Sequence, residues 1–161
     1  MANKILISVE ENLSQPQWID NVEEFVQKAL IEAGYEDEEI SILFCSDKFI
    51  QNLNNEYRHI DAPTDVLSFE NGQEYVDEDG IKWYAAGDIA ISLETLPKNA
   101  QYFEVDEDEE LKRLLVHGLL HLNGYDHGDE HVEKNKEPVC EMLKKQKQIM
   151  DCLKTQTIMG K

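Results

Sequence analysis

The hydrophobic pattern of this chain has two kinds of segment, one with apolar residues at alternate positions and one with apolar residues every three or four positions. The first kind predicts strands, because successive side chains of a strand point to opposite faces. It occurs at residues 4–9, 40–45, 66–69 and 88–91. Residues 70–80 are polar, acidic and contain glycine, so we expect an exposed hairpin loop there.

The second kind of segment predicts helices. Ser14 and Pro16 form a helix-start signal, and apolar residues then recur at helical spacing up to Gly34. Further helices are expected at residues 46–57, 93–103, 104–122 and 129–153, the last with a restart at Pro138. Strands interleaved with helices in this irregular order predict an α+β fold, in which a small mixed four-stranded sheet packs with about five helices.

Length and composition narrow the class of protein. The 161 residues fit one domain, residues 1–161, and 41% hydrophobic with 30% charged residues excludes collagen-like and fully disordered chains. No apolar run approaches the roughly 20 residues that a spanning helix needs, and no signal-peptide pattern is present. The three cysteines are scattered without a C-x-x-C pair, which favours reduced thiols and a cytoplasmic location.

The net charge of −19 argues against a polyanionic partner, because phosphate affinity comes largely from Lys and Arg. The charge is unevenly distributed, however. Residues 1–110 carry 6 basic and 27 acidic side chains, whereas residues 111–161 carry 9 basic and 7 acidic ones. Any anion site is therefore local. The acidic run at residues 104–110 could be a metal or protein site, but the apolar helix face that follows favours a helix N-terminus, where negative charge is stabilised.

The most specific pattern is the spacing H-x-x-x-H-x-x-G-x-x-H formed by His117, His121, Gly124 and His127. Two histidines four residues apart project from one face of a helix, and Gly124 can end that helix in a left-handed turn that returns His127 to the same point. This is the spacing of the zincin-like, metzincin zinc helix. Three imidazoles leave a fourth position open, which is typical of a catalytic zinc site, although nickel, copper or cobalt also accept nitrogen ligands.

One position departs from the zinc protease motif. Those enzymes carry a Glu directly after the first His as general base, whereas this chain has Gly118. Glycine cannot take a proton, so we do not expect peptide hydrolysis by that route.

A second set of motifs lies upstream of the histidines. It comprises L-N-N-E-Y-R ending at Arg58, P-T-D-V-L-S-F over residues 63–69, and G-D-I-A-I-S from Gly87. From the residues alone, Arg58 is equally well a solvated surface residue or a planar, permanently charged fork for phosphate.

Together these segments resemble the YbeY family, endoribonucleases that act in ribosomal RNA maturation and ribosome quality control. The resemblance rests on residues 57–69, on Gly87-Asp88-Ile89 and on the run from His117 to His127, and it covers most of the chain up to about residue 150. The tail to Lys161 lies outside it.

The resemblance implies a metal-dependent, single-strand-specific endoribonuclease that is cytoplasmic and processes 16S rRNA. It implies that His117, His121 and His127 hold one zinc ion per chain and that Arg58 is the functionally important arginine. Three further residues match family positions, and we expect structural roles for them: Asp65, Ser68 and Asp126. The implied partners are single-stranded RNA and the small ribosomal subunit, with no membrane and no DNA.

Two points stay open on the sequence. A chain this acidic must build any basic groove from Arg58, Arg113 and the lysines of the last helix. The alternatives to an RNA phosphodiesterase are a metal-dependent hydrolase of another bond, peptide or small molecule, and a non-catalytic ribosome-binding factor whose metal only secures the fold.

Overall fold

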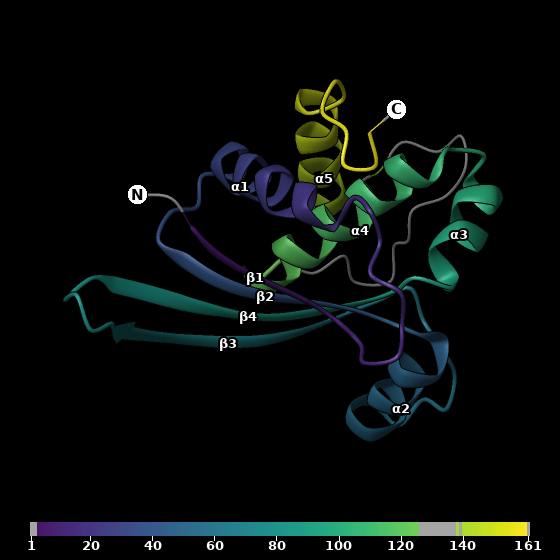
Figure 1. Ribbon diagram of the computed structural model, residues 1–161. Coiled ribbons are helices and arrows are strands. Elements are labelled where there is room, and N and C mark those ends of the chain that lie inside the picture. The colour runs from purple at the N-terminus through teal and green to yellow at the C-terminus, as the bar shows by residue number, and fades with distance from the viewer. Residues whose placement is uncertain (1–2, 126–137, 139, 161) are drawn as a thin grey trace.

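The computed structural model describes residues 3–125, 138 and 140–160 (Figure 1). Within these residues the chain forms a four-stranded mixed sheet and five α-helices, which confirms the predicted α+β class. The elements in chain order are β1 (Lys4–Val9), the short 3-10 helix η1 (Ile19–Asn21), α1 (Val22–Ala33), β2 (Glu38–Cys45), α2 (Asp47–Arg58), β3 (Val66–Val76), β4 (Lys82–Ser92), α3 (Thr95–Phe103), α4 (Glu107–Leu122) and α5 (Glu141–Cys152).

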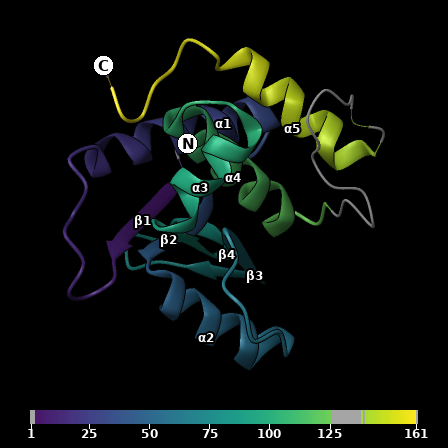
Figure 2. The same cartoon turned by 90° about the vertical axis from the view of Figure 1, so that its right-hand side faces the viewer.

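The sheet has the strand order β1-β2-β4-β3. β1, β2 and β4 are parallel, whereas β3 runs antiparallel to β4. Alternate residues of β2 point to the same face, and Ile40, Ile42 and Phe44 are almost fully buried there. In both views α1, α3, α4 and α5 lie on this side of the sheet and α2 lies on the other (Figures 1 and 2).

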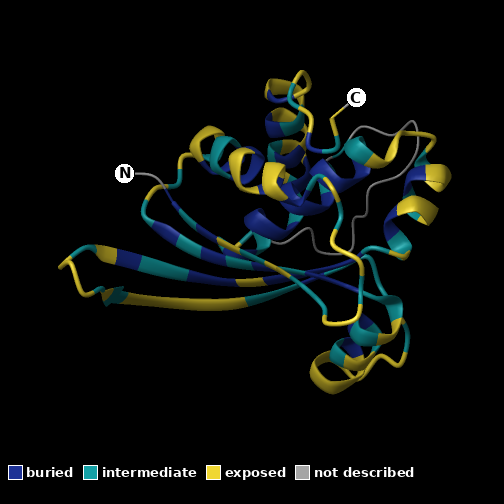
Figure 3. Ribbon diagram, in the orientation of Figure 1, coloured by how far each residue is buried: buried dark blue, intermediate teal, exposed yellow. Residues whose placement is uncertain are grey.

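α4 forms the centre of the helical layer, and most of its residues are buried (Figure 3). Its acidic beginning acts as predicted for a helix N-terminus. Asp106 is the N-cap, and its Oδ1 accepts a hydrogen bond from the Glu109 backbone N–H at 2.8 Å. Four acidic residues occupy the first turn, where the helix dipole stabilises negative charge.

Two glycines set how closely α4 approaches the sheet. A Cβ at Gly118 would lie 2.8 Å from Ile89 Cδ1 of β4. Gly87 of β4 has φ +147°, and a Cβ there would lie 2.1 Å from the Phe69 carbonyl oxygen and 2.8 Å from Leu122 Cδ2. Gly118 therefore lets α4 pack closely on Ile89, and Gly87 leaves room for the Phe69 carbonyl and the Leu122 side chain.

α2 covers part of the opposite face. Ser46 caps it as predicted, with its hydroxyl oxygen accepting from the Phe49 backbone N–H at 3.2 Å. Ile50 packs with Cys45, Leu67 and Ala90 in a second, smaller cluster beneath the sheet.

Two regions differ from the prediction, the hairpin after Phe69 and the start of α1. Residues 70–76 continue β3 instead of forming a loop, and β4 already begins at Lys82. Most side chains of residues 70–76 are exposed, so this two-stranded ribbon needs backbone hydrogen bonds but no apolar alternation (Figure 3). α1 begins at Val22, after η1, and not at the Ser14–Pro16 signal. α5 is described from Glu141, soon after Pro138, while residues 129–137 lie outside the described part of the chain.

The segment after α5 folds back onto the other helices. Ile158 is fully buried, and its carbonyl oxygen accepts from Asn21 Nδ2 at 2.9 Å. Asp108 Oδ1 accepts from the backbone N–H groups of Ile158 and Met159, each at 2.8 Å. No helix among the described residues has the length and apolarity that crossing a membrane requires.

Candidate metal centre and active site

The predicted histidine pair lies on one face of α4, close to its end. The rings of His117 and His121 are 4.7 Å apart between centroids and inclined at 75°. Both side chains are partly exposed on a helix that is otherwise largely buried. Two imidazoles this close, at a helix edge that solvent reaches, fit the chemistry of nitrogen ligands for one transition metal ion.

The chain leaves α4 through the turn that the sequence predicts. Gly124 has φ +90°, its N–H donates to the His121 carbonyl, and the Tyr125 N–H donates to the Leu120 carbonyl. His127, the predicted third ligand, and Asp126 lie outside the described residues, so the third ligand stays a prediction.

Sequence reasoning missed a side chain on α5 that contacts the pair. His117 Nδ1 and Gln146 Oε1 are 2.8 Å apart, and Gln146 is buried. The lysines of this helix are visible in the sequence as a run of positive charge, but no pattern marks a single glutamine on a buried helix face.

A second unpredicted group lies where α4 ends. Asn123 Nδ2 donates to Glu38 Oε1 at 3.1 Å and to the Leu119 carbonyl at 3.0 Å. Burial raises the pKa of the Glu38 carboxyl above its usual value, and the hydrogen bond from Asn123 opposes this in part. Burial also raises the pKa of Tyr35 to about 12, with Tyr125 and Glu38 contributing. These contacts fasten the end of the histidine helix to the start of β2.

Arg58 is the last residue of α2, and its side chain is exposed. The helix ends at His59, which adopts φ +61°, and Asn54 Nδ2 donates to the Ala62 carbonyl at 2.9 Å. The backbone beside Arg58 is thus held firmly while its guanidinium is not used in packing. None of the hydrogen bonds or ion pairs among the described residues joins Arg58 to His117 or His121.

Arg113 does not contribute to a basic groove, which the sequence suggested for it. Its guanidinium lies 2.6 Å from Glu110 Oε2 and 3.5 Å from Asp65 Oδ2, and it stacks over the Phe103 ring at 5.1 Å. Asn99 Nδ2 also donates to Asp65 Oδ2 at 2.8 Å. This cluster joins α3, α4 and the start of β3, so Arg113 is a structural residue.

Asp65 has the structural role expected for it. Besides its contacts to α3 and α4, its Oδ1 accepts from the Val66 backbone N–H at 2.7 Å, which caps the start of β3. Ser68 is half-buried in β3.

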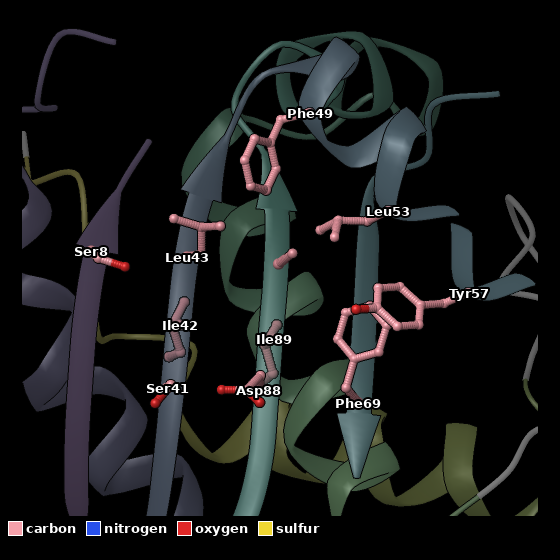
Figure 4. Close-up of a pocket in the computed structure, with 11 residues that line it drawn as sticks. Ser8, Ser41, Ile42, Leu43, Phe49, Leu53, Tyr57, Phe69, Asp88 and Ile89 are labelled. Carbon is pink, nitrogen blue, oxygen red and sulfur yellow. The ribbon is translucent and has the colours of Figure 1, made fainter. Parts of the chain in front are cut away.

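A pocket of about 450 Å³ lies between α2 and the sheet face opposite α4 (Figure 4). Tyr57 and Phe69 form an edge-to-face pair at its rim, with centroids 5.2 Å apart. Asp88 lines the pocket, while its neighbour Ile89 meets Gly118 on the other face. The Gly87-Asp88-Ile89 motif therefore serves both faces of the sheet.

The fold and the paired histidines define a class, that of α+β proteins with a zincin-like helix lying across a small mixed sheet. Comparison with known proteins identifies the family. The model of the family described as "Endoribonuclease YbeY" matches residues 5–154. The chain therefore belongs to the YbeY family of endoribonucleases.

Individual relatives agree with this assignment. An "Endoribonuclease YbeY" of Treponema denticola is 53% identical over 146 residues, which cover 89% of this chain and 90% of the relative. One of Aquifex aeolicus is 37% identical over 137 residues, covering 84% and 86%. The solution structure of TM1509 from Thermotoga maritima matches with a TM-score of 0.57 and 31% identity, over 94% of this chain and 90% of that one.

Proposed function

We propose that this protein is a cytoplasmic, metal-dependent endoribonuclease that cleaves single-stranded RNA during 16S rRNA maturation and ribosome quality control. The observation that carries the proposal is the His117–His121 pair, held on one face of α4 in a chain of an endoribonuclease family. We assign the metal to these two histidines together with His127, as one zinc ion or a similar divalent transition ion per chain.

The histidines hold the ion as neutral imidazoles and leave its charge uncompensated. When bound, such an ion supplies Lewis-acid chemistry toward a phosphoryl oxygen. The chain's own part is to fix the ligands. α4 is buried on its other sides and fastened at its end through Asn123 and Glu38, so the two imidazoles have a rigid support.

Arg58 is proposed to bind the scissile phosphate. Its planar guanidinium can donate to two phosphate oxygens at once, and it stabilises charge that increases in the transition state. Its exposure and its place as the last residue of a firmly held helix support this role. α5 lies against the site through Gln146 and carries Lys144, which adds an exposed positive charge to that helix.

Single strands suit such a site. An unpaired chain can splay its bases and bend its backbone toward a helix edge, whereas an A-form duplex presents a rigid surface.

The lack of space for a side chain at Gly118 argues against the peptidase alternative. A zinc protease needs a Glu at that position, and here even a Cβ would lie within 2.8 Å of a buried isoleucine. A hydrolase of a small-molecule bond and a ribosome-binding factor with a structural metal are the remaining alternatives.

Zinc-loaded protein incubated with unstructured RNA and, separately, with a denatured protein tests the proposal. We expect cleavage of the RNA alone. His117→Ala, His121→Ala and His127→Ala should each lower the zinc content well below one per chain and abolish cleavage. If His121→Ala unfolds the protein instead, the metal secures the fold. Full zinc retention in any single variant would remove that residue from the metal site.

A further inference from the structure

One side-chain contact bears on the tautomer of the His117 ring. The atom of Gln146 that faces the ring is its amide oxygen, at 2.8 Å from His117 Nδ1. An amide oxygen can only accept a hydrogen bond, so with the Gln146 amide in this orientation Nδ1 carries the proton. A neutral imidazole has one N–H, and Nε2 then keeps its lone pair.

We propose that Gln146 is a positioning residue for the metal centre, which holds His117 as the Nδ1–H tautomer and orients Nε2 toward the metal. This inference rests on the metal centre proposed above. In metal sites, partners that accept the second ring N–H of a ligand histidine fix both its tautomer and its orientation.

The place of Gln146 on α5 supports this role. α5 packs against α4 (Figure 2), and the other residues that it buries are Met142, Leu143 and Ile149. An apolar side chain at residue 146 would continue that face with no polar group to desolvate. A buried amide is costly unless it is hydrogen-bonded, and the acceptor of Gln146 is directed at His117, one of the two predicted ligands on α4. α5 thereby becomes part of the metal centre, although it supplies no ligand.

Three variants separate positioning from packing. Gln146→Leu removes the acceptor and places an apolar side chain among the apolar residues that α5 buries. Gln146→Glu keeps an acceptor for the Nδ1–H. Gln148→Leu makes the same change as the first variant at an exposed position of the same helix. The apparent zinc Kd is measured by competition with a chromophoric chelator, and thermal melting is recorded on the zinc-free proteins.

The positioning role predicts that Gln146→Leu weakens zinc binding about 10- to 100-fold while the zinc-free protein melts near the wild-type temperature. Gln146→Glu should stay within about threefold of wild type, because a carboxylate accepts the same hydrogen bond. Gln148→Leu should have the zinc Kd and the melting temperature of wild type. If Gln146 only packs, Gln146→Leu should bind zinc as wild type does, because leucine is tolerated at a buried position. Gln146→Glu should then be the weaker variant, because a buried carboxylate is not tolerated.

A readout without zinc tests the contact itself. Long-range ¹H–¹⁵N correlation at pH 8, with His117 assigned from the His117→Ala spectrum, should show the Nδ1–H tautomer in wild type and a mixture in Gln146→Leu. An Nε2–H tautomer in wild type overturns the proposal, as does an unchanged zinc Kd in Gln146→Leu. If wild type binds no zinc while the Nδ1–H tautomer is present, the metal centre fails and the contact survives as a structural one.

Discussion

At the residue scale, Gly118 decides how near the histidine helix lies to β4. We expect Gly118→Ala to lower the free energy of unfolding by about 1 kcal/mol. Overpacking against Ile89 costs roughly 1–3 kcal/mol, and alanine's better helix propensity returns about 1 kcal/mol.

The control is the double variant with Ile89→Val, which removes the nearest atom, Cδ1. In that background Gly118→Ala should cost less, because only Cγ1 and Cγ2, each 3.1 Å from the added Cβ, remain in its way. Urea unfolding of the four proteins gives the coupling. Loss of RNA cleavage should follow the loss of stability. A large loss of cleavage at wild-type stability and zinc content would instead mean that the helix backbone at residue 118 contacts the substrate.

Arg58 gives the second prediction at this scale. Arg58→Lys should preserve the melting temperature and zinc content, because the side chain is exposed, while RNA cleavage falls by about 10²-fold. Lysine offers a point charge in place of a bidentate fork. Arg58→Ala should lower the RNA cleavage rate further than Arg58→Lys does, at a similar melting temperature.

Lys48→Ala is the matched control for Arg58, since it removes an exposed positive charge from the first turn of the same helix. Its cleavage rate should equal that of wild type. Normal cleavage by Arg58→Lys would reduce Arg58 to a general positive charge, and normal cleavage by Arg58→Ala would exclude it from the site.

At the element scale, the sequence predicts what periodicity and spacing encode. The four strands, the turn at Gly124 after α4 and the facing histidines all follow from local pattern. The ribbon at residues 70–76 does not, because its side chains are largely exposed and show no apolar alternation. Gln146 could not be predicted either. Its role depends on how α5 packs against α4, a contact between residues 29 positions apart.

The attachment of α4 to β2 gives a prediction on pH. Burial raises the pKa of Glu38, so between the unfolded and folded pKa values the native state binds more protons than the unfolded state. Stability therefore falls as the pH rises through this window, which begins near the ordinary glutamate pKa. Glu38→Gln keeps an acceptor for Asn123 and removes the titration. The variant should be more stable than wild type at pH 7, with the difference shrinking as the pH falls below the window.

Urea unfolding of wild type and Glu38→Gln from pH 4 to pH 8 measures this difference. Glu39→Gln, at the next and more exposed position of β2, is the control and should show no such gain above the window. A Glu38→Gln variant that is less stable at pH 7 would mean that the carboxylate is the preferred form in the folded protein.

At the scale of the whole molecule, a net charge of −19 has to be reconciled with an RNA substrate. Several of the positively charged side chains are also engaged in contacts within the protein and are not available to bind phosphate. Arg113 is committed to Glu110 and Asp65, Lys112 is buried against the Gln156 carbonyl, and Lys147 pairs with Asp151. Binding therefore rests on few phosphate contacts.

The dependence of RNA binding on salt tests this directly. Each phosphate contact to a single strand contributes about −0.7 to the slope of log K against log [salt]. With Arg58 and one or two lysines of α5 in contact, we expect a slope of about −1.4 to −2, measured by fluorescence anisotropy with a short labelled RNA. The His121→Ala background prevents cleavage during the measurement. Adding Arg58→Ala should make the slope shallower by about 0.7, the share of one phosphate, whereas Lys48→Ala should leave it unchanged. A slope steeper than about −4 would contradict this account, because it needs more cationic contacts than Arg58 and the free lysines of α5 supply.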